Sequence, residues 1–393
     1  MINKEKKIVK EDFGSIGIAP GACGLYAEIG DCHLDASLRA TDTMQERGTF
    51  GAGVLLRGIY PRRANYYAFH VMYRNRKIAT DLERLFEEGK LSVRLYGEME
   101  PLVIPEAYRK YDLPVMRRYF VGPPTEDEMR LRAHTSNENA YIRRVVETFN
   151  DQYVGDARIF SSGKNLGVFI TAMELKDTIE VFELNQYVDR PITAILIHMR
   201  WPTSIVESGI WWGAHPISIL DTAIVHNGDL SSAPSNRLAL RCADIKRSVG
   251  TDSEAILLEL DNLITHHNFS YEEVEWIICQ KFPKELSTLD DNTKAAYYKL
   301  VNDPLLNRYK MSGPSSFISL IGNKVIAGRD RDGLRQLWMG ESEDKSRVIW
   351  SSEEKVIFQS AWMTGENFRA SNCDPGKLIA YEFDSSNSIS RVF

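Results

Sequence analysis

The segment CGLYAEIG, residues 23–30, joins a cysteine and a glycine to a short strand-like run. The glycine after Cys23 would leave the thiol approachable. Such a thiol is either a nucleophile or a small buried side chain at the start of a strand. In front of it stand 22 residues, which end in the small, turn-forming segment GIAPGA (17–22). What this upstream segment does is the first question that the sequence raises.

Composition indicates an ordinary globular protein with a substantial core. The 393 residues are 43% hydrophobic and 26% charged, enough for one large or two modest domains. A net charge of −6 gives no basic footprint for nucleic acid. The sequence contains no run of about 18 apolar residues, so it does not predict a membrane span.

The cysteines are odd in number and contain no CxxC pair, which argues against a disulfide framework or a zinc site. They are Cys23, Cys32, Cys242, Cys279 and Cys373. We therefore expect a reducing cytoplasm as the location. A lone cysteine near the start of such a chain is a candidate thiol nucleophile.

The pattern along the chain predicts an α+β fold of packed antiparallel sheets, with an α/β block at residues 60–150. Thr80 and Glu83, and again Ser270 and Glu273, have the spacing of a helix capping box. A helix start is predicted at Thr251-Asp252, and Gly322-Asn323 predicts a hairpin turn. No linker is long enough to require a domain split.

Three further segments carry candidate chemistry. ILIHMRWPTS (195–204) leads a hydrophobic strand to Arg200, whose guanidinium suits a carboxylate but also an ordinary surface ion pair. TAIVHNGDL (222–230) contains Asn227-Gly228, which suits an oxyanion hole, although a hairpin turn is the commoner meaning of this dipeptide. GTDSEA (250–255) places Asp252 at a helix start, where capping is the simplest role and ammonium binding the alternative.

These segments, in this order, resemble the class II glutamine amidotransferases, the N-terminal-nucleophile family with a catalytic cysteine. QERGTFGAG (45–53), VIAGRDRDGLRQLWMG (325–340) and CDPGKLIAYEF (373–383) are similar to further motifs of that family. SSGKNLGVF (161–169) and WWGAHPISILDTAIVHNGDLSS (211–232) resemble most closely the stand-alone amidotransferase subunit of archaeal-type glutamate synthases. Gln336 departs from the family pattern, which commonly has a proline there.

The resemblance implies a four-layer αββα sandwich of two antiparallel sheets, covering residues 23–393 with an insertion at about 60–150. It implies hydrolysis of L-glutamine by Cys23, with its own α-amine as the base and Asn227 and Gly228 as the oxyanion hole. Residues 1–22 would then be a propeptide or an N-terminal extension. His198, His215 and His226 are expected to be structural.

The resemblance also assigns the substrate contacts. Arg200 would bind the α-carboxylate of glutamine and Asp252 its α-ammonium. Trp201 and Thr203 would line the carboxylate site, and Arg47 would order the pocket.

The sequence contains no P-loop, Rossmann glycine motif or cysteine cluster, so it does not predict a cofactor or metal. The ammonia therefore implies an acceptor partner, first of all an FMN-containing, glutamate synthase-like subunit that aminates 2-oxoglutarate. An N-methylglutamate synthase or another amidating ligase is also compatible with the sequence. The alternative is a catalytically silent glutamine-binding or assembly subunit of such a complex.

Overall fold

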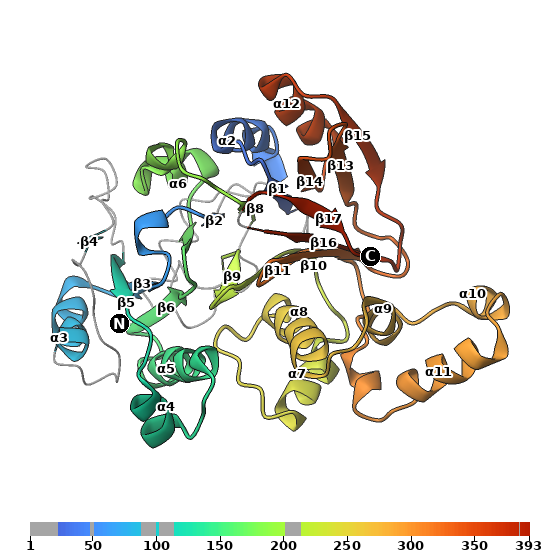
Figure 1. Cartoon of the computed structure of the whole chain (residues 1–393), viewed down its shortest axis with the longest axis horizontal. Helices are drawn as coiled ribbons and strands as arrows, with labels where there is room; N and C mark the ends of the chain where they lie inside the picture. The colour runs from blue at the N-terminus through green and yellow to red at the C-terminus, as the bar shows by residue number, and fades with distance from the viewer. Residues whose placement is uncertain (1–22, 48–50, 88–99, 102–113, 201–213, 385) are drawn as a thin grey trace, which may run out of the picture.

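The structure is a computed structural model that describes residues 23–47, 51–87, 100–101, 114–200, 214–384 and 386–393. These residues form three antiparallel sheets, of which two lie face to face (Figure 1). Their strands are rich in β-branched and aromatic residues, which suit a pleated surface buried on both faces.

The first sheet contains the strand that follows Cys23, with β8 on one side of it and β14 on the other. In spatial order its strands are β15 (Phe368–Asn372), β13 (Trp338–Ser342), β14 (Arg347–Ser351), β1 (Gly24–Gly30), β8 (Ala194–Met199), β2 (Ala52–Arg57) and β7 (Leu166–Thr171). Its outer face is covered by α2 (Leu34–Asp42), α6 (Leu175–Val181) and α12 (Glu354–Thr364).

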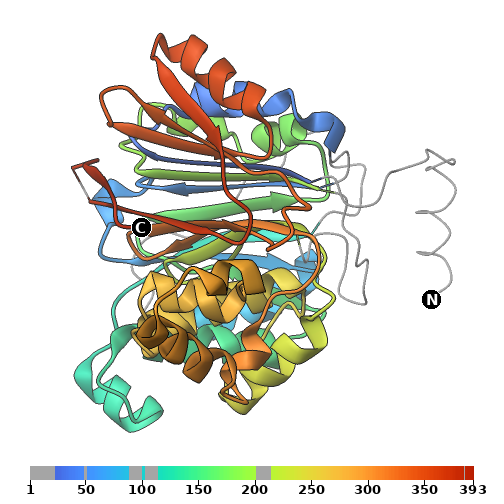
Figure 2. The same ribbon diagram turned by 90° about the vertical axis from the view of Figure 1, so that its right-hand side faces the viewer.

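The second sheet lies against the first, with β10 and β11 opposite β1. Its order is β17 (Ile389–Arg391), β16 (Leu378–Phe383), β12 (Lys324–Arg329), β11 (Ser315–Ile321), β10 (Thr222–Gly228) and β9 (Ile217–Ile219). Its outer face carries α7 (Ala233–Cys242), α8 (Asp252–Asp261) and α9 (Tyr271–Ile278). Figure 2 shows the two sheets stacked between these two helical layers. The expected α+β sandwich of the αββα type is therefore confirmed.

Most of the third sheet comes from residues 60–150, the segment expected as an insertion, and its last strand follows that segment. Its order is β4 (Glu100–Pro101), β5 (Val115–Val121), β3 (Tyr67–Tyr73) and β6 (Ala157–Ser161). The helices that belong to it are α3 (Arg76–Glu87), α4 (Glu126–Ala133) and α5 (Glu138–Gln152). A hydrogen bond joins β6 to β9 of the second sheet: Ser218 Oγ donates to the carbonyl of Phe160 at 2.9 Å.

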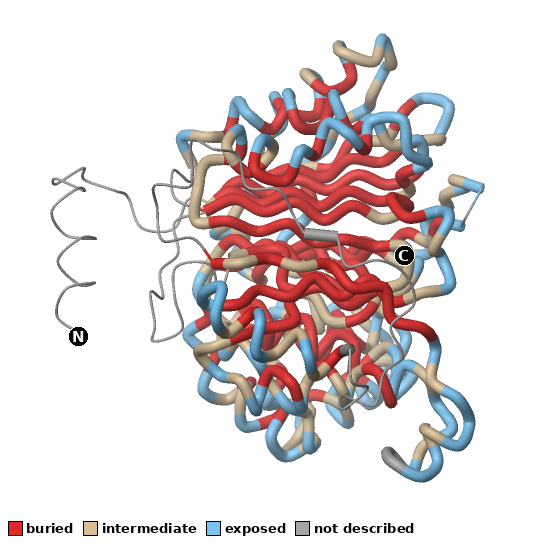
Figure 3. The backbone as a smooth tube through the Cα atoms, turned by 90° about the vertical axis from the view of Figure 1, so that its left-hand side faces the viewer, coloured by how far each residue is buried: buried red, intermediate tan, exposed pale blue. Residues whose placement is uncertain are grey.

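The hydrophobic core follows the layers. One cluster of buried side chains fills the space between the stacked sheets and reaches under α2, α6 and α12. A second lies between the second sheet and α7 to α9, and a third between the third sheet and its helices. Figure 3 shows the strands buried and the outer turns of the helices exposed.

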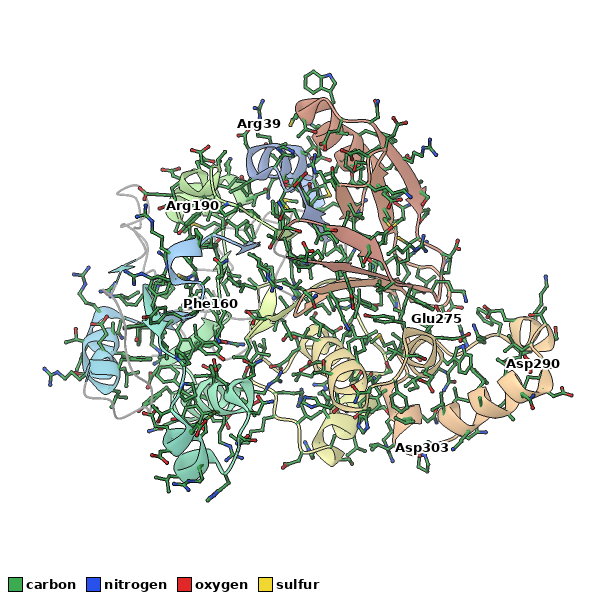
Figure 4. The ribbon with its side chains drawn as sticks, viewed as in Figure 1. Arg39, Phe160, Arg190, Glu275, Asp290 and Asp303 are labelled. Atoms are coloured by element: carbon green, nitrogen blue, oxygen red, sulfur yellow. The ribbon has the colours of Figure 1, made fainter. Side chains whose placement is uncertain are left out.

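The two helices that directly follow α9 extend outward from these layers (Figure 1). They are α10 (Pro283–Ser287) and α11 (Asp291–Val301). α9 itself is tied to β16 through Glu275, labelled in Figure 4, whose Oε2 accepts a hydrogen bond from the backbone N–H of Leu378 at 3.0 Å.

Of the two capping boxes predicted from the sequence, one is present in the structure and the other is not. The capping box at Ser270 and Glu273 is present with both of its hydrogen bonds at the start of α9. The one at Thr80 and Glu83 is not, because α3 begins at Arg76 and Thr80 Oγ1 donates to the Arg76 carbonyl inside the helix.

Candidate functional site

Cys23 stands directly in front of β1 and is half-buried. Gly24 pairs with Met199 of β8, and a Cβ at Gly24 would lie 2.9 Å from Met199 Cε. The glycine therefore lets the strand begin close beside β8. The backbone nitrogen of Cys23 donates a hydrogen bond to Oδ1 of Asn227 over 3.3 Å. This contact joins the first sheet to the second at one end of the sandwich.

Asn227 and Gly228 are the last residues of β10, and the side chain of Asn227 is buried. Both pair with β11, Gly228 opposite Ser315, so the hairpin-turn interpretation of this Asn-Gly pair is wrong. Gly228 has a φ of +148°, and a Cβ there would lie 2.0 Å from the carbonyl oxygen of Pro314. Only glycine fits this backbone without strain. With Oδ1 facing Cys23, Nδ2 of Asn227 is left as a hydrogen-bond donor.

Asp252 is the first residue of α8. The helix cap is Thr251, whose side chain accepts from the N–H of Glu254 at 3.2 Å, so Asp252 has a different role from capping. Its Oδ2 accepts from the N–H of Leu230 at 3.0 Å and its Oδ1 from the N–H of Ser253 at 2.8 Å. These bonds fix the carboxylate beside the end of β10. A carboxylate has about four lone-pair sites, so it retains capacity for an ammonium group.

Arg200 follows the last residue of β8, and its N–H donates to the carbonyl of Gly51 at 2.7 Å. Its Nη1 lies 3.4 Å from Nδ1 of His215. Trp201 and Thr203, the other residues expected around a carboxylate, lie outside the described residues. The structure therefore brings Arg200 to the same end of the sandwich as Cys23.

Arg47 lies in the short 3₁₀ turn Gln45–Arg47 after α2. Its guanidinium forms an ion pair with Glu353, at the start of α12. α2 itself ends at Asp42, so Arg47 lies outside that helix.

The charges of these residues affect the pKa of the Cys23 thiol. Burial raises its pKa, and the positive charge of Arg200 is the largest opposing effect. Arg335 and Arg47 also lower the thiol pKa, whereas Asp252 raises it. The charged residues expected from the sequence thus all act on Cys23.

Arg335 is the residue among these for which the sequence predicts no role. It lies in DRDGLRQ (330–336), a segment that resembles the family's motifs without indicating any chemistry for this arginine. The available signal was an arginine in a turn directly after a buried strand, since β12 ends at Arg329.

The histidines near the site are buried and hydrogen-bonded. His226 binds the hydroxyls of Ser253 and Ser315, each at 3.0 Å, and so ties β10 to α8 and to β11. His198 Nε2 lies 3.0 Å from the carbonyl oxygen of His226. Burial lowers the pKa of His226 to about 4 and that of His198 to about 3. Groups so weakly basic are poor general bases near neutral pH.

Among the described residues, no cluster of three or more histidine, cysteine, aspartate or glutamate side chains is arranged to hold a metal ion. Within the same residues, every helix is too short or too polar to cross a membrane.

Comparisons with known proteins identify one relative by sequence. Over 350 residues the chain is 32% identical to an uncharacterized protein of Archaeoglobus fulgidus, and the match covers 86% of each chain. The chain belongs to the family of that archaeal protein. No protein-family model matches it.

Among solved structures, the chain is similar to the allosteric regulatory enzyme of purine biosynthesis, with a TM-score of 0.43 and 13% identity. Glutamine phosphoribosylpyrophosphate amidotransferase from B. subtilis gives 0.40 and 13%. Each match covers 94% of this chain and 48% of the other, so this chain spans about half the length of those two. A predicted glutamine amidotransferase from Pseudomonas aeruginosa PA01 gives 0.28 and 10%, covering 93% of this chain and 99% of that one.

Proposed function

We propose that this protein is the glutaminase component of a class II glutamine amidotransferase. It hydrolyses L-glutamine to glutamate and ammonia through a thioester on Cys23. The observation that carries the proposal is the 3.3 Å hydrogen bond from Cys23 N to Asn227 Oδ1, which joins residues 204 positions apart. The sequence resemblance independently names this pair as nucleophile and oxyanion donor.

In the proposed reaction, Sγ of Cys23 attacks the side-chain amide carbon of glutamine, and the thiol proton passes to the α-amine of Cys23. The negative charge that develops on the amide oxygen is held by Nδ2 of Asn227 and the N–H of Gly228. The proton then moves to the leaving nitrogen, the C–N bond breaks and ammonia departs. Water attacks the thioester, forming a C–O bond and breaking the C–S bond, which releases glutamate and restores the thiol.

Substrate selection rests on two opposite charges. Arg200 binds the α-carboxylate, and Asp252, held by two backbone N–H groups, binds the α-ammonium. Together they select free glutamine over glutamine within a peptide, which lacks both charges. The resemblance assigns Trp201 and Thr203 to the carboxylate side, and we propose that Arg47 orders the pocket through its ion pair with Glu353.

The mechanism requires a free α-amine on Cys23, because an amide nitrogen has no basic lone pair. We therefore include removal of residues 1–22 as a propeptide. Attack of the Cys23 thiol on the Ala22 carbonyl, followed by hydrolysis of the resulting thioester, would free the amine without a separate protease.

The ammonia requires an acceptor, and we propose a partner synthase of the glutamate synthase type. The cytoplasm, where glutamine is plentiful and thiols stay reduced, is the proposed location. The specific acceptor follows from the resemblance alone.

The test is glutamine hydrolysis by the purified protein, measured as glutamate and ammonia released. Cys23→Ala is expected to abolish turnover, and a thiol-directed glutamine analogue to label Cys23. Cys242→Ala is the matched control, because Cys242 is exposed at the end of α7. Full turnover by Cys23→Ala would overturn the proposal. Glutamine binding without turnover in the wild-type protein with a free Cys23 amine would instead identify a silent binding subunit.

A further inference from the structure

One cavity of the structure is lined almost entirely by charged side chains. It has a volume of about 210 Å³ and lies at the C-terminal end of α7, against the loop that leads to α8. Four of its six lining residues are basic and one is acidic; they are Arg237, Arg241, Asp244, Ile245, Lys246 and Arg247. The proposed glutaminase reaction uses none of these side chains, so the cavity needs a separate explanation.

Two of the arginines come from α7 itself. Arg237 and Arg241 are one turn apart, so their side chains share one face of the helix. Nε of Arg237 donates to the Ala233 carbonyl at 3.1 Å. The helix dipole favours a cation in the last turn, which accounts for Arg241 by itself. It does not account for further arginines beside it, because like charges at this spacing destabilise a helix.

The third arginine, Arg247, is not satisfied by its neighbours. Its Nη1 is buried and has no hydrogen-bond partner among the described residues. Burial lowers the pKa of its guanidinium, Glu254 opposes this effect, and the charges of Arg237 and Arg241 lower the pKa further. A buried donor without an acceptor costs free energy, and so does the crowding of like charges. An anion in the cavity would relieve both.

The loop that carries Arg247 is held by main-chain contacts on both sides. Asp244 has a φ of +56°, and the N–H of Ile245 donates back into the last turn of α7 at 2.9 Å, which closes the helix. Ile245 then packs against the core cluster between the second sheet and its helices. Beyond Arg247, the carboxylate of Glu254 accepts from the N–H groups of residues 248–250. The wall of the cavity is therefore a fixed part of the fold.

Acidic side chains near the cavity leave its positive charge largely uncompensated. Lys246 pairs with Asp151 of α5, with 3.2 Å between Nζ and Oδ2. Glu254 is engaged by the backbone of the loop. Asp244 is exposed and forms no ion pair with the described residues. Three arginines thus share the cavity with one unpaired carboxylate, in a protein whose net charge is −6.

The chemistry of the lining selects a small anion with several oxygen acceptors. Guanidinium groups bind phosphate oxygens through two parallel hydrogen bonds, and several of them can surround one phosphoryl group. The volume of 210 Å³ is below the roughly 300–1,000 Å³ of sites for drug-sized ligands. We propose that this cavity is a binding site for a phosphate or diphosphate group, held by Arg237, Arg241 and Arg247.

The test is isothermal titration calorimetry of the whole chain with inorganic pyrophosphate. The wild-type protein is expected to show saturable binding. Arg247→Gln and Arg241→Gln are each expected to weaken it by about 10- to 100-fold, because each removes charge-assisted hydrogen bonds. Arg247→Lys is expected to lose less than Arg247→Gln, since it keeps the charge but not the planar fork. Arg241 is exposed, so its variant keeps the test valid if Arg247→Gln fails to fold.

Arg190→Gln is the matched control, because it removes the same charge from an exposed residue outside the cavity. Figure 4 labels Arg190 beside the helical layer on the other sheet, away from α7. Its affinity for pyrophosphate is expected to equal that of the wild-type protein. Absence of saturable binding in the wild-type protein, or an equal loss in Arg190→Gln and Arg247→Gln, would overturn the proposal.

Further titrations identify the source and the class of the anion. Tighter binding of glycerol 3-phosphate than of inorganic phosphate would identify a phosphate ester as the ligand, and the reverse order would identify the free anion. Citrate has carboxylates spread over a carbon frame, so binding of citrate as tight as that of pyrophosphate would overturn the phosphate assignment. These titrations involve no glutamine, so their outcome is independent of the proposed glutaminase.

Discussion

The backbone N–H of Leu230 donates to Oδ2 of Asp252 at 3.0 Å, which ties the chain leaving β10 to the first turn of α8. Asp252 Oδ1 also lies 4.0 Å from Nδ1 of His226, two residues before Gly228. A strand end and a helix start, more than 20 residues apart in sequence, are therefore locked together by one carboxylate. This arrangement presents a fixed negative charge beside the oxyanion-hole candidates.

Asp252→Asn is expected to raise the Michaelis constant for glutamine with a smaller effect on kcat. A lost charge-assisted hydrogen bond costs about 1.5–3 kcal/mol, or roughly one to two decades in affinity. Steady-state kinetics measure this, and Arg200→Lys should act in the same direction because it loses the planar fork. Asp244→Asn, on the exposed loop after α7, is the control. A purely kcat effect in Asp252→Asn would contradict ammonium binding.

Asn227→Ala is expected to lower kcat by about 100- to 1,000-fold while changing the Michaelis constant little. The reason is that Nδ2 serves charge that develops only in the transition state. Asn227→Asp keeps an acceptor for the N–H of Cys23 but loses the amide donor, so it should be at least as inactive. If Asn227→Ala changed only the Michaelis constant, the oxyanion role would be excluded.

Gly228→Ala is expected to destabilise the fold and abolish activity together. The new Cβ would collide with the Pro314 carbonyl at 2.0 Å, on a residue whose φ is +148°. Backbone strain alone costs roughly 1–3 kcal/mol, before the collision is counted. Gly250→Ala separates the two effects, because Gly250 has a φ of +80° but open space around it. Urea unfolding should therefore show a clearly larger loss for Gly228→Ala, and equal losses would refute the steric argument.

Stability is expected to fall as the pH drops below about 6.5, the ordinary pKa of histidine. Burial lowers the pKa of His198 to about 3 and of His226 to about 4, so between these values and 6.5 only the unfolded chain binds their protons. The unfolded state is then favoured by about 1.4 kcal/mol per pH unit for each histidine. Urea unfolding at pH 7.5 and pH 5 measures this. His134→Asn, at the exposed end of α4, should leave the slope unchanged, and a flat wild-type profile would contradict the prediction.

Intact-mass measurement of natively expressed protein is expected to give a chain that starts at Cys23. The physical reason is that the proposed base is the free α-amine of this residue. A block to processing, such as Cys23→Ala, should leave residues 1–22 attached. A fully active protein that still carries Met1 to Ala22 would refute the α-amine mechanism.

Many local features of the fold could be predicted from the sequence. The capping box at Ser270, the helix start at Thr251 and the turn at Gly322-Asn323 all appear as predicted, because each depends on residues within one turn of the chain. The apolar strands likewise indicated buried antiparallel sheets. Thr80 failed as a cap because a helix that continues through it leaves no helix end to satisfy.

The sequence by itself also determined the order of candidate residues, from Cys23 through Arg200 and Asn227 to Asp252. Only the tertiary structure decided what they do for one another. It placed Asn227-Gly228 in a strand rather than a turn, because β11 pairs with these residues from far along the chain. It also fixed the turn after β12 to the end of β10, because Asp330 accepts a hydrogen bond from the N–H of Ser315, which lies opposite Gly228. Such contacts depend on sheet pairing and stacking, which no local pattern around either residue records.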